Sequence, residues 1–186
     1  KSETSNRGEN AYRGNSGPLH TTTGHLKNPL YQAFVDAGVE AGYSRTEDPN
    51  GFQQEGFGPM DMTVRKGVRS STSNAYLKPA ISRHNLHVSA GTIVSRILFE
   101  DGRAVGVEYK QGSNVYRVNV RRDVILSGGP IASPQLLMLS GVGDQKELSD
   151  IGIDVVHHLP GVGKNLQDHL ELYVQQECTQ PVSLYS

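Results

Sequence analysis

The sequence predicts a mixed α/β fold, on the evidence of three observations. Several β-rich runs separated by short turn sequences follow Asn85, which is typical of an antiparallel meander. Residues 123–126 follow, and the last three of them are aliphatic, as in a strand buried within a parallel sheet. That run leads through the glycine pair Gly128 and Gly129 into a predicted helix.

The first predicted helix begins near Asn28. An asparagine can cap the free backbone N–H groups, Pro29 suits the first helical position, and Gly42 ends the helix. A second, short helix is expected over residues 70–76, and we expect it to stop at Pro79, because proline breaks helical hydrogen bonding.

Strands dominate the middle of the chain. Asp101–Gly102 and Gln111–Asn114 favour hairpin turns between neighbouring runs. The predicted strands are residues 86–88, 92–99, 104–109, 115–120, 123–126 and 153–156, of which 92–99, 104–109 and 115–120 form the meander.

Two helices are expected after the glycine pair. In the first, Ser133 is a suitable N-cap and Pro134 a suitable first residue, and Gly141 closes the helix. In the second, Asp144 is followed three residues later by a glutamate, which resembles a capping box, and Gly152 ends it.

Composition limits the functional class. The 186 residues carry a net charge of −1, so a nucleic acid is not an expected partner. No apolar stretch approaches the roughly 20 residues of a membrane-spanning helix, and Cys178, the single cysteine, cannot form an internal disulfide. Both ends look cut, so we expect a segment of a longer protein.

One motif is long enough to be specific. Residues 129–143 resemble, at all fifteen positions, the second signature of the glucose–methanol–choline oxidoreductases. Residues 159–169 are similar to the next conserved stretch of that family, and residues 67–109 match it too. Within the family, residues 50–62 and 163–180 are most similar to the choline-oxidising members.

The resemblance implies a fold and a reaction. The fold would be a partial FAD-binding Rossmann-like domain with an antiparallel meander, residues 63–166, plus parts of a sheet-based substrate domain, residues 1–62 and 167–186. The reaction would be hydride transfer from an alcohol, choline, to FAD, with electrons passing to a respiratory acceptor. Localisation would be mitochondrial and inner-membrane-associated in a eukaryote, or cytoplasmic or inner-membrane-associated in a bacterium.

The resemblance also implies binding residues. Val94 matches a valine whose backbone contacts the adenine, although a buried strand residue explains it equally well. Ser127, Gly128 and Gly129 lie where such folds meet the cofactor, or simply form a tight turn. Glu171 matches a carboxylate that faces the trimethylammonium group of choline. Alternation would place it with His169 and Tyr173 on one strand face.

Two parts of the family pattern have no counterpart here. The sequence holds no G-x-G-x-x-G fingerprint and no match to the family's C-terminal catalytic histidine, so we assign no catalytic residue to this chain. His157 and His158 point to opposite faces if they form a strand, which makes a metal site a poor expectation. Two alternatives stay open: another alcohol oxidoreductase of the family, or a non-catalytic module without flavin.

Overall fold

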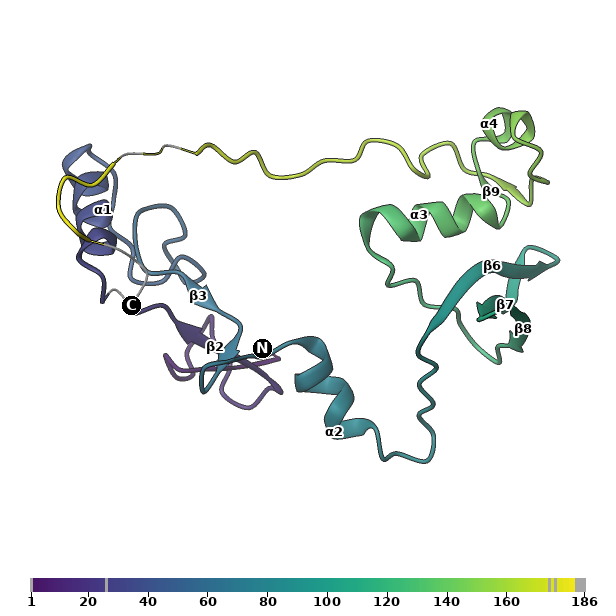
Figure 1. Cartoon of the computed structure of the whole chain (residues 1–186), viewed down its shortest axis with the longest axis horizontal. Coiled ribbons are helices and arrows are strands. Elements are labelled where there is room, and N and C mark those ends of the chain that lie inside the picture. The colour runs from purple at the N-terminus through teal and green to yellow at the C-terminus, as the bar shows by residue number, and fades with distance from the viewer. Residues whose placement is uncertain (1, 26, 174, 176, 183–186) are drawn as a thin grey trace. The chain divides into compact units, whose positions relative to one another are not determined.

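The computed structural model describes residues 2–25, 27–173, 175 and 177–182 (Figure 1). These residues form two compact units. Unit 1 contains the described residues up to Val88 and after Tyr173, and unit 2 is Ser89–Tyr173. No helix in the described part of the chain has the length and apolar character that a bilayer crossing requires.

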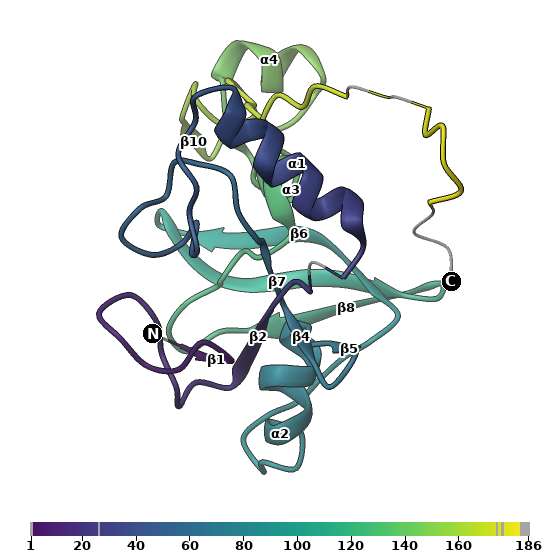
Figure 2. The same cartoon turned by 90° about the vertical axis from the view of Figure 1, so that its left-hand side faces the viewer.

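Unit 1 is built on short strands. Strand β1 (Glu3–Ser5) pairs in parallel with β2 (Leu19–Thr23), which pairs antiparallel with β3 (Asp61–Met62). Strands β4 (Val64–Arg65) and β5 (Val68–Arg69) form a separate hairpin (Figure 2).

Helix α1 (Pro29–Glu40) confirms the first helix prediction. The Asn28 side chain accepts a hydrogen bond from the Leu30 N–H at 2.9 Å, and Gly42 has a φ of 91° beyond the helix end. The ring of Phe57 packs on this helix, with its centroid 5.3 Å from that of Phe34. The aromatic contact therefore fixes the loop before β3 against α1.

The second helix extends beyond its predicted end. A π-helical turn η1 (Ser73–Leu77) continues directly into the single turn α2 (Lys78–Ala80), so Pro79 lies inside helical structure and the predicted break was wrong. Proline is tolerated in the first turn of a helix, where its missing N–H leaves no bond unmade. The change from η1 to α2 makes Pro79 such a first-turn residue.

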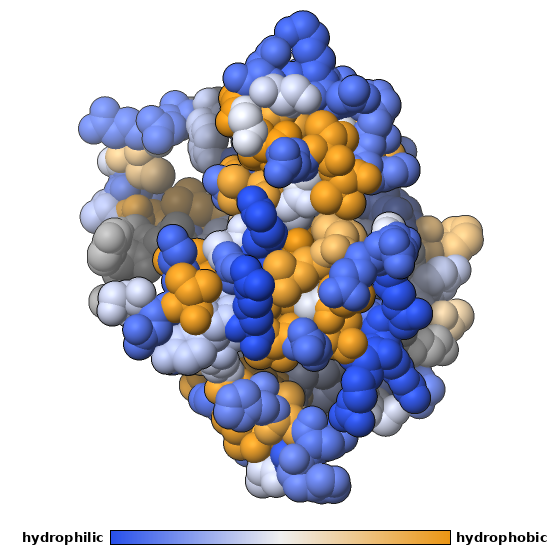
Figure 3. Space-filling model, turned by 90° about the vertical axis from the view of Figure 1, so that its right-hand side faces the viewer, coloured by the Kyte–Doolittle hydropathy of each residue, from blue (hydrophilic) through white to orange (hydrophobic). Residues whose placement is uncertain are grey.

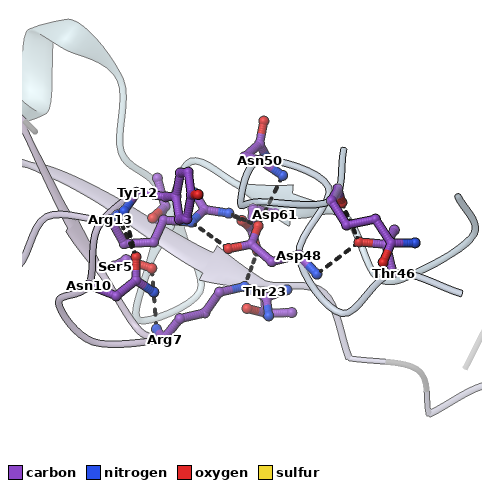
Figure 4. Close-up of polar contacts among 12 residues, drawn as sticks. Ser5, Arg7, Asn10, Tyr12, Arg13, Thr23, Thr46, Asp48, Asn50 and Asp61 are labelled. Carbon is purple, nitrogen blue, oxygen red and sulfur yellow. Dashed lines mark hydrogen bonds and ion pairs between the residues drawn. The ribbon is translucent and has the colours of Figure 1, made fainter. Parts of the chain in front are cut away.

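A buried ionic cluster holds the strands and loops of unit 1 together (Figure 4). Arg13 is 5% exposed and contacts three carboxylates, with its Nε donating to Asp48 at 2.9 Å. Its other two carboxylate partners are Asp61 and Glu3. Arg7 binds Asp61 as well, with 3.1 Å between Nε and Oδ1. Hydrogen bonding from Arg13 holds the pKa of Asp48 below its ordinary value.

Unit 2 contains the antiparallel meander that the sequence predicted. Strands β6 (Thr92–Glu100), β7 (Arg103–Gln111) and β8 (Asn114–Asn119) pair in that order (Figure 2). Asp101 and Gly102 have φ values of 48° and 73°, the left-handed conformation of a tight hairpin turn.

Helix α3 (Gly129–Leu139) packs on β6. Ser140, at its C-terminal end, joins the two elements: its Oγ accepts the Ile97 N–H at 2.8 Å and donates to the Leu136 carbonyl at 2.6 Å. Helix α4 (Gln145–Asp150) is capped by Asp144 as predicted. Its Leu148 is fully buried.

The predicted start of α3 was wrong. The helix begins at Gly129, and Pro134 lies within it. Pro130 and Pro134 are both suited to the first turn of a helix. Pro130 occupies the first turn of α3. Ser133 does not cap the helix; its Oγ accepts the Gly128 N–H at 3.1 Å from inside the helix.

Three predicted strands are absent from the described structure: residues 86–88, 123–126 and 153–156 are not strands. In place of the last, β10 (His157–His158) pairs in parallel with β9 (Val142–Gly143). An aliphatic run forms a strand only when another strand pairs with it. In the described part of the chain, no strand pairs with residues 123–126. The parallel-sheet prediction at 123–126 is therefore corrected.

Gly141 provides a test of the close approach between the segment after α3 and residues 154–156. Its φ is 86°, and an added Cβ would lie 2.4 Å from the Asp154 carbonyl oxygen. Gly152 is a matched control, because its φ is 74° and no atom lies within 4 Å of its added Cβ.

We expect Gly152→Ala to lower the free energy of unfolding by about 1–2 kcal/mol, the strain of a positive φ. Gly141→Ala should cost about 1–3 kcal/mol more, because the backbone must also shift. Chemical denaturation of the two variants measures the difference. Equal losses would show that the close approach of Asp154 does not persist in solution.

Candidate functional site

A crevice in unit 2 collects most of the predicted cofactor contacts. It has a volume of about 450 Å³ and lies between the start of β6, the segment before α3 and one side of α3. Val94, Ser127 and Gly128 all line it. Gly129 does not line it, but is the first residue of α3 and has a φ of 85°.

The crevice is apolar and uncharged. Its lining is mainly aliphatic and includes no Asp, Glu, Lys, Arg or His: Thr92, Ile93, Val94, Val107, Val124, Ile125, Leu126, Ser127, Gly128, Ala132, Ser133, Gln135, Leu136 and Leu139. Such a surface favours a flat, uncharged ring system over a phosphate group.

Close packing accounts for the small residue at position 128. A Cβ added to Gly128 would lie 3.3 Å from that of Ala132 and 3.4 Å from the Ser133 N. The Gly128 N–H is already bonded to Ser133. A ligand would therefore find an exposed glycine backbone here, but not the free N–H group of Gly128.

The backbone beside Val94 is irregular, which the sequence did not indicate. Val94 pairs with Tyr109, but the register shifts before Arg96, so that Ser95 forms a bulge. The Ser95 hydroxyl contacts the Glu108 carbonyl and carboxylate oxygens, each at 3.2 Å. Bulges occur frequently beside binding sites, because they redirect neighbouring side chains.

Glu171 lies outside this crevice. Residues 167–173 form no strand, so the shared strand face expected for His169, Glu171 and Tyr173 was wrong. The Tyr173 hydroxyl nevertheless donates a hydrogen bond to the Glu171 carboxylate, which raises the pKa of Tyr173. Both side chains are exposed, so a carboxylate and an aromatic ring are presented together.

The two histidines in β10 differ in their surroundings. The Nδ1 of His158 accepts the Gln145 N–H at 3.0 Å, at the start of α4. That bond gives His158 a structural role. No group of three or more His, Cys, Asp or Glu side chains suited to a metal ion occurs within the described ranges.

Apolar surface is extensive on unit 2. A second hollow of about 620 Å³ lies against α3, lined by residues that include Ile131, Leu137, Met138 and Leu166. Figure 3 shows apolar residues, in orange, gathered over the middle of one face between hydrophilic ones, in blue. Large apolar side chains that include Ile131, Ile151 and Leu166 are therefore exposed on unit 2.

Comparison with known proteins gives one family. A family model described as GMC oxidoreductase matches residues 3–171. Choline dehydrogenase, mitochondrial, from Mus musculus is 61% identical over 179 residues, which cover 96% of this chain and 30% of that protein. Oxygen-dependent choline dehydrogenase from Pseudomonas fluorescens is 57% identical over 189 residues, covering 100% of this chain and 33% of that protein. The chain thus spans about a third of the length of these relatives.

Solved structures agree with this family. Pyridoxine 4-oxidase from Mesorbium loti has a TM-score of 0.83 and 30% identity, over 90% of this chain and 33% of that one. An FAD-dependent oxidoreductase from Chaetomium thermophilum has a TM-score of 0.81 and 31% identity, over 86% of this chain and 28% of that one. The fold class predicted from the sequence is confirmed.

Proposed function

The chain belongs to the GMC oxidoreductase family, and from that premise we propose that it is part of a longer, FAD-dependent enzyme that oxidises choline to betaine aldehyde. The observation that carries this proposal is the 61% identity, over 96% of the chain, to a protein named choline dehydrogenase. The exposed apolar surface of unit 2 supports the proposal of a longer protein, since further chain would cover it.

The cofactor proposal rests on the crevice as well as the family. Its uncharged, aliphatic lining and volume of about 450 Å³ fit the adenine end of FAD. Val94, Ser127 and Gly128 would contact that end, with Gly129 beside it. The bound flavin would supply the hydride acceptor. We propose no catalytic residue in this chain.

Domain roles are also proposed. Residues 63–166 would contribute to the FAD-binding domain, and residues 1–62 and 167–186 to the substrate domain.

For localisation we propose the mitochondrion if the source is eukaryotic, since the mouse relative is named mitochondrial, and the cytoplasm or inner membrane if it is bacterial. A respiratory chain component is the proposed electron acceptor.

Substrate preference is proposed to depend on Glu171. A quaternary ammonium has no N–H to donate, so negative charge and aromatic faces hold it. Glu171 supplies the charge, and Tyr173, bonded to it, supplies an adjacent ring. An alcohol oxidoreductase acting on a neutral substrate would gain nothing from this carboxylate.

Flavin content and substrate choice test the proposal. We expect the complete protein to purify with one FAD and to reduce an artificial electron acceptor when choline is added. A flavin-free protein would support the non-catalytic alternative, and a flavoprotein active only on neutral alcohols would support another member of the family.

The 186-residue chain alone should retain no FAD, because its crevice offers no charged partner for the pyrophosphate.

A further inference from the structure

Positive charge is concentrated in one stretch of this chain. No Asp or Glu occurs between Asp61 and Glu100, whereas six Lys or Arg residues do, although the whole chain has a net charge of −1. Part of this stretch forms the β4–β5 hairpin and the η1–α2 helical segment of unit 1. The concentration therefore reflects a local surface and not the overall composition.

Three cationic residues line a hollow of about 240 Å³ in unit 1. Arg65 and Arg69 come from the hairpin and Lys78 from α2, and no Asp or Glu lines the hollow. His20 of β2 is a further lining residue. Three positively charged residues thus border a space large enough for a small ligand.

These three cations differ from other arginines of the same unit. Arg13 and Arg45 each have a carboxylate within ion-pair distance. Within the described residues, Arg65, Arg69 and Lys78 have no such pair. Their charges are therefore available to an anionic ligand.

A buried hydroxyl in the same hollow adds a directional donor. Ser70 is 6% exposed, and its Oγ accepts the His20 N–H at 3.2 Å. Among the described residues, the Ser70 O–H donates to no acceptor. Ser70 lines the hollow, so its hydroxyl can donate a hydrogen bond to an oxygen of a ligand bound there.

We propose that this hollow is a binding site for a phosphate-sized oxyanion, free in solution or at the headgroup of a phospholipid. Arg65 and Arg69 match the planar, bidentate geometry of phosphate oxygens, and Lys78 adds a point charge. The Ser70 hydroxyl donates to a further oxygen. The site excludes cations, including choline, by its charge, and it is independent of alcohol oxidation.

Calorimetric titration of the complete protein with inorganic phosphate at low ionic strength tests the site. We expect Arg69→Gln and Lys78→Gln each to weaken phosphate binding about tenfold, as for loss of one charge-assisted hydrogen bond. Lys66→Gln is the matched control: it removes the same charge from the turn of the same hairpin, and Lys66 does not line the hollow. It should change the dissociation constant less than about twofold.

A second arm identifies the source of the oxyanion. The same variants are mixed with phosphatidylcholine vesicles that contain or lack phosphatidylglycerol, and cosedimentation is measured. Binding to phosphatidylglycerol that is lost in Arg69→Gln and kept in Lys66→Gln supports the site with a lipid ligand, and calorimetric binding alone supports it with free phosphate. The proposal is overturned if wild type binds neither, or if Lys66→Gln weakens binding as much as the other two variants.

Discussion

Replacing Glu171 with glutamine in the complete protein should lower kcat/KM for choline by between about ten- and a hundredfold. The carboxylate attracts the trimethylammonium charge at short range, and a neutral amide of similar shape does not. The loss should appear chiefly in KM, because the substrate keeps its positive charge throughout the reaction and the attraction acts equally on ground and transition states. Tyr173 would keep its ring but lose a charged hydrogen-bond partner.

A neutral substrate and a second glutamate make this result specific. Oxidation of 3,3-dimethylbutan-1-ol, in which carbon replaces the charged nitrogen of choline, should change little in Glu171→Gln. Glu177→Gln removes the same charge from an exposed position six residues later, and it should leave both substrates unaffected. Steady-state kinetics of both variants with both substrates gives the comparison. Equal losses on choline and its neutral analogue would remove the choline assignment.

The sequence was most informative where structure depends on neighbouring residues. The meander from Thr92 to Asn119 follows from alternating runs and a tight turn at Asp101–Gly102, all close together in the chain. Helix α1 follows from the cap at Asn28 in the same way. Each of these elements needs only nearby partners, so local patterns were sufficient to predict them.

Predictions that depend on distant partners failed. Residues 123–126 have the aliphatic pattern of a buried strand, yet no strand of the described chain pairs with them. In the candidate site, Val94 and Gly128 line one crevice, and their contact with FAD stays a prediction. Ser95 forms a bulge beside them that no sequence signal indicates. The sequence predicted a shared strand face for Glu171 and Tyr173, but no strand forms there, and the hydrogen bond between the two side chains was not predicted.

The ionic cluster of unit 1 is the strongest case of distant partners, and Arg13→Met should reveal its importance. Arg13 and Asp48 are 35 residues apart, and no local pattern links them. Removing the guanidinium would leave Asp48, Asp61 and Glu3 close together, with Arg7 as the remaining cation near them. We expect the free energy of unfolding to fall by about 3–5 kcal/mol, as when one partner of a buried ion pair is removed.

Arg45→Met is the matched control, because Arg45 pairs with Glu47 while its own side chain is 42% exposed. Its loss should cost less than about 1 kcal/mol, since water screens exposed ion pairs. Chemical denaturation of the complete protein at neutral pH measures both variants. Similar midpoints for Arg13→Met and Arg45→Met would contradict the proposed role of the cluster.

Acid should reduce the difference between wild type and Arg13→Met. The pKa of Asp48 is lowered in the folded protein, first by the hydrogen bond from Arg13. A lowered folded-state pKa contributes stability that is present above the unfolded value of about 4 and is lost as pH falls through the folded value. Wild type should therefore lose stability as pH falls below about 4, and the variant should lose less, because it lacks this bond. A difference in unfolding free energy that stays constant from neutral pH to about pH 3 would show that the charge of Asp48 is not what Arg13 stabilises.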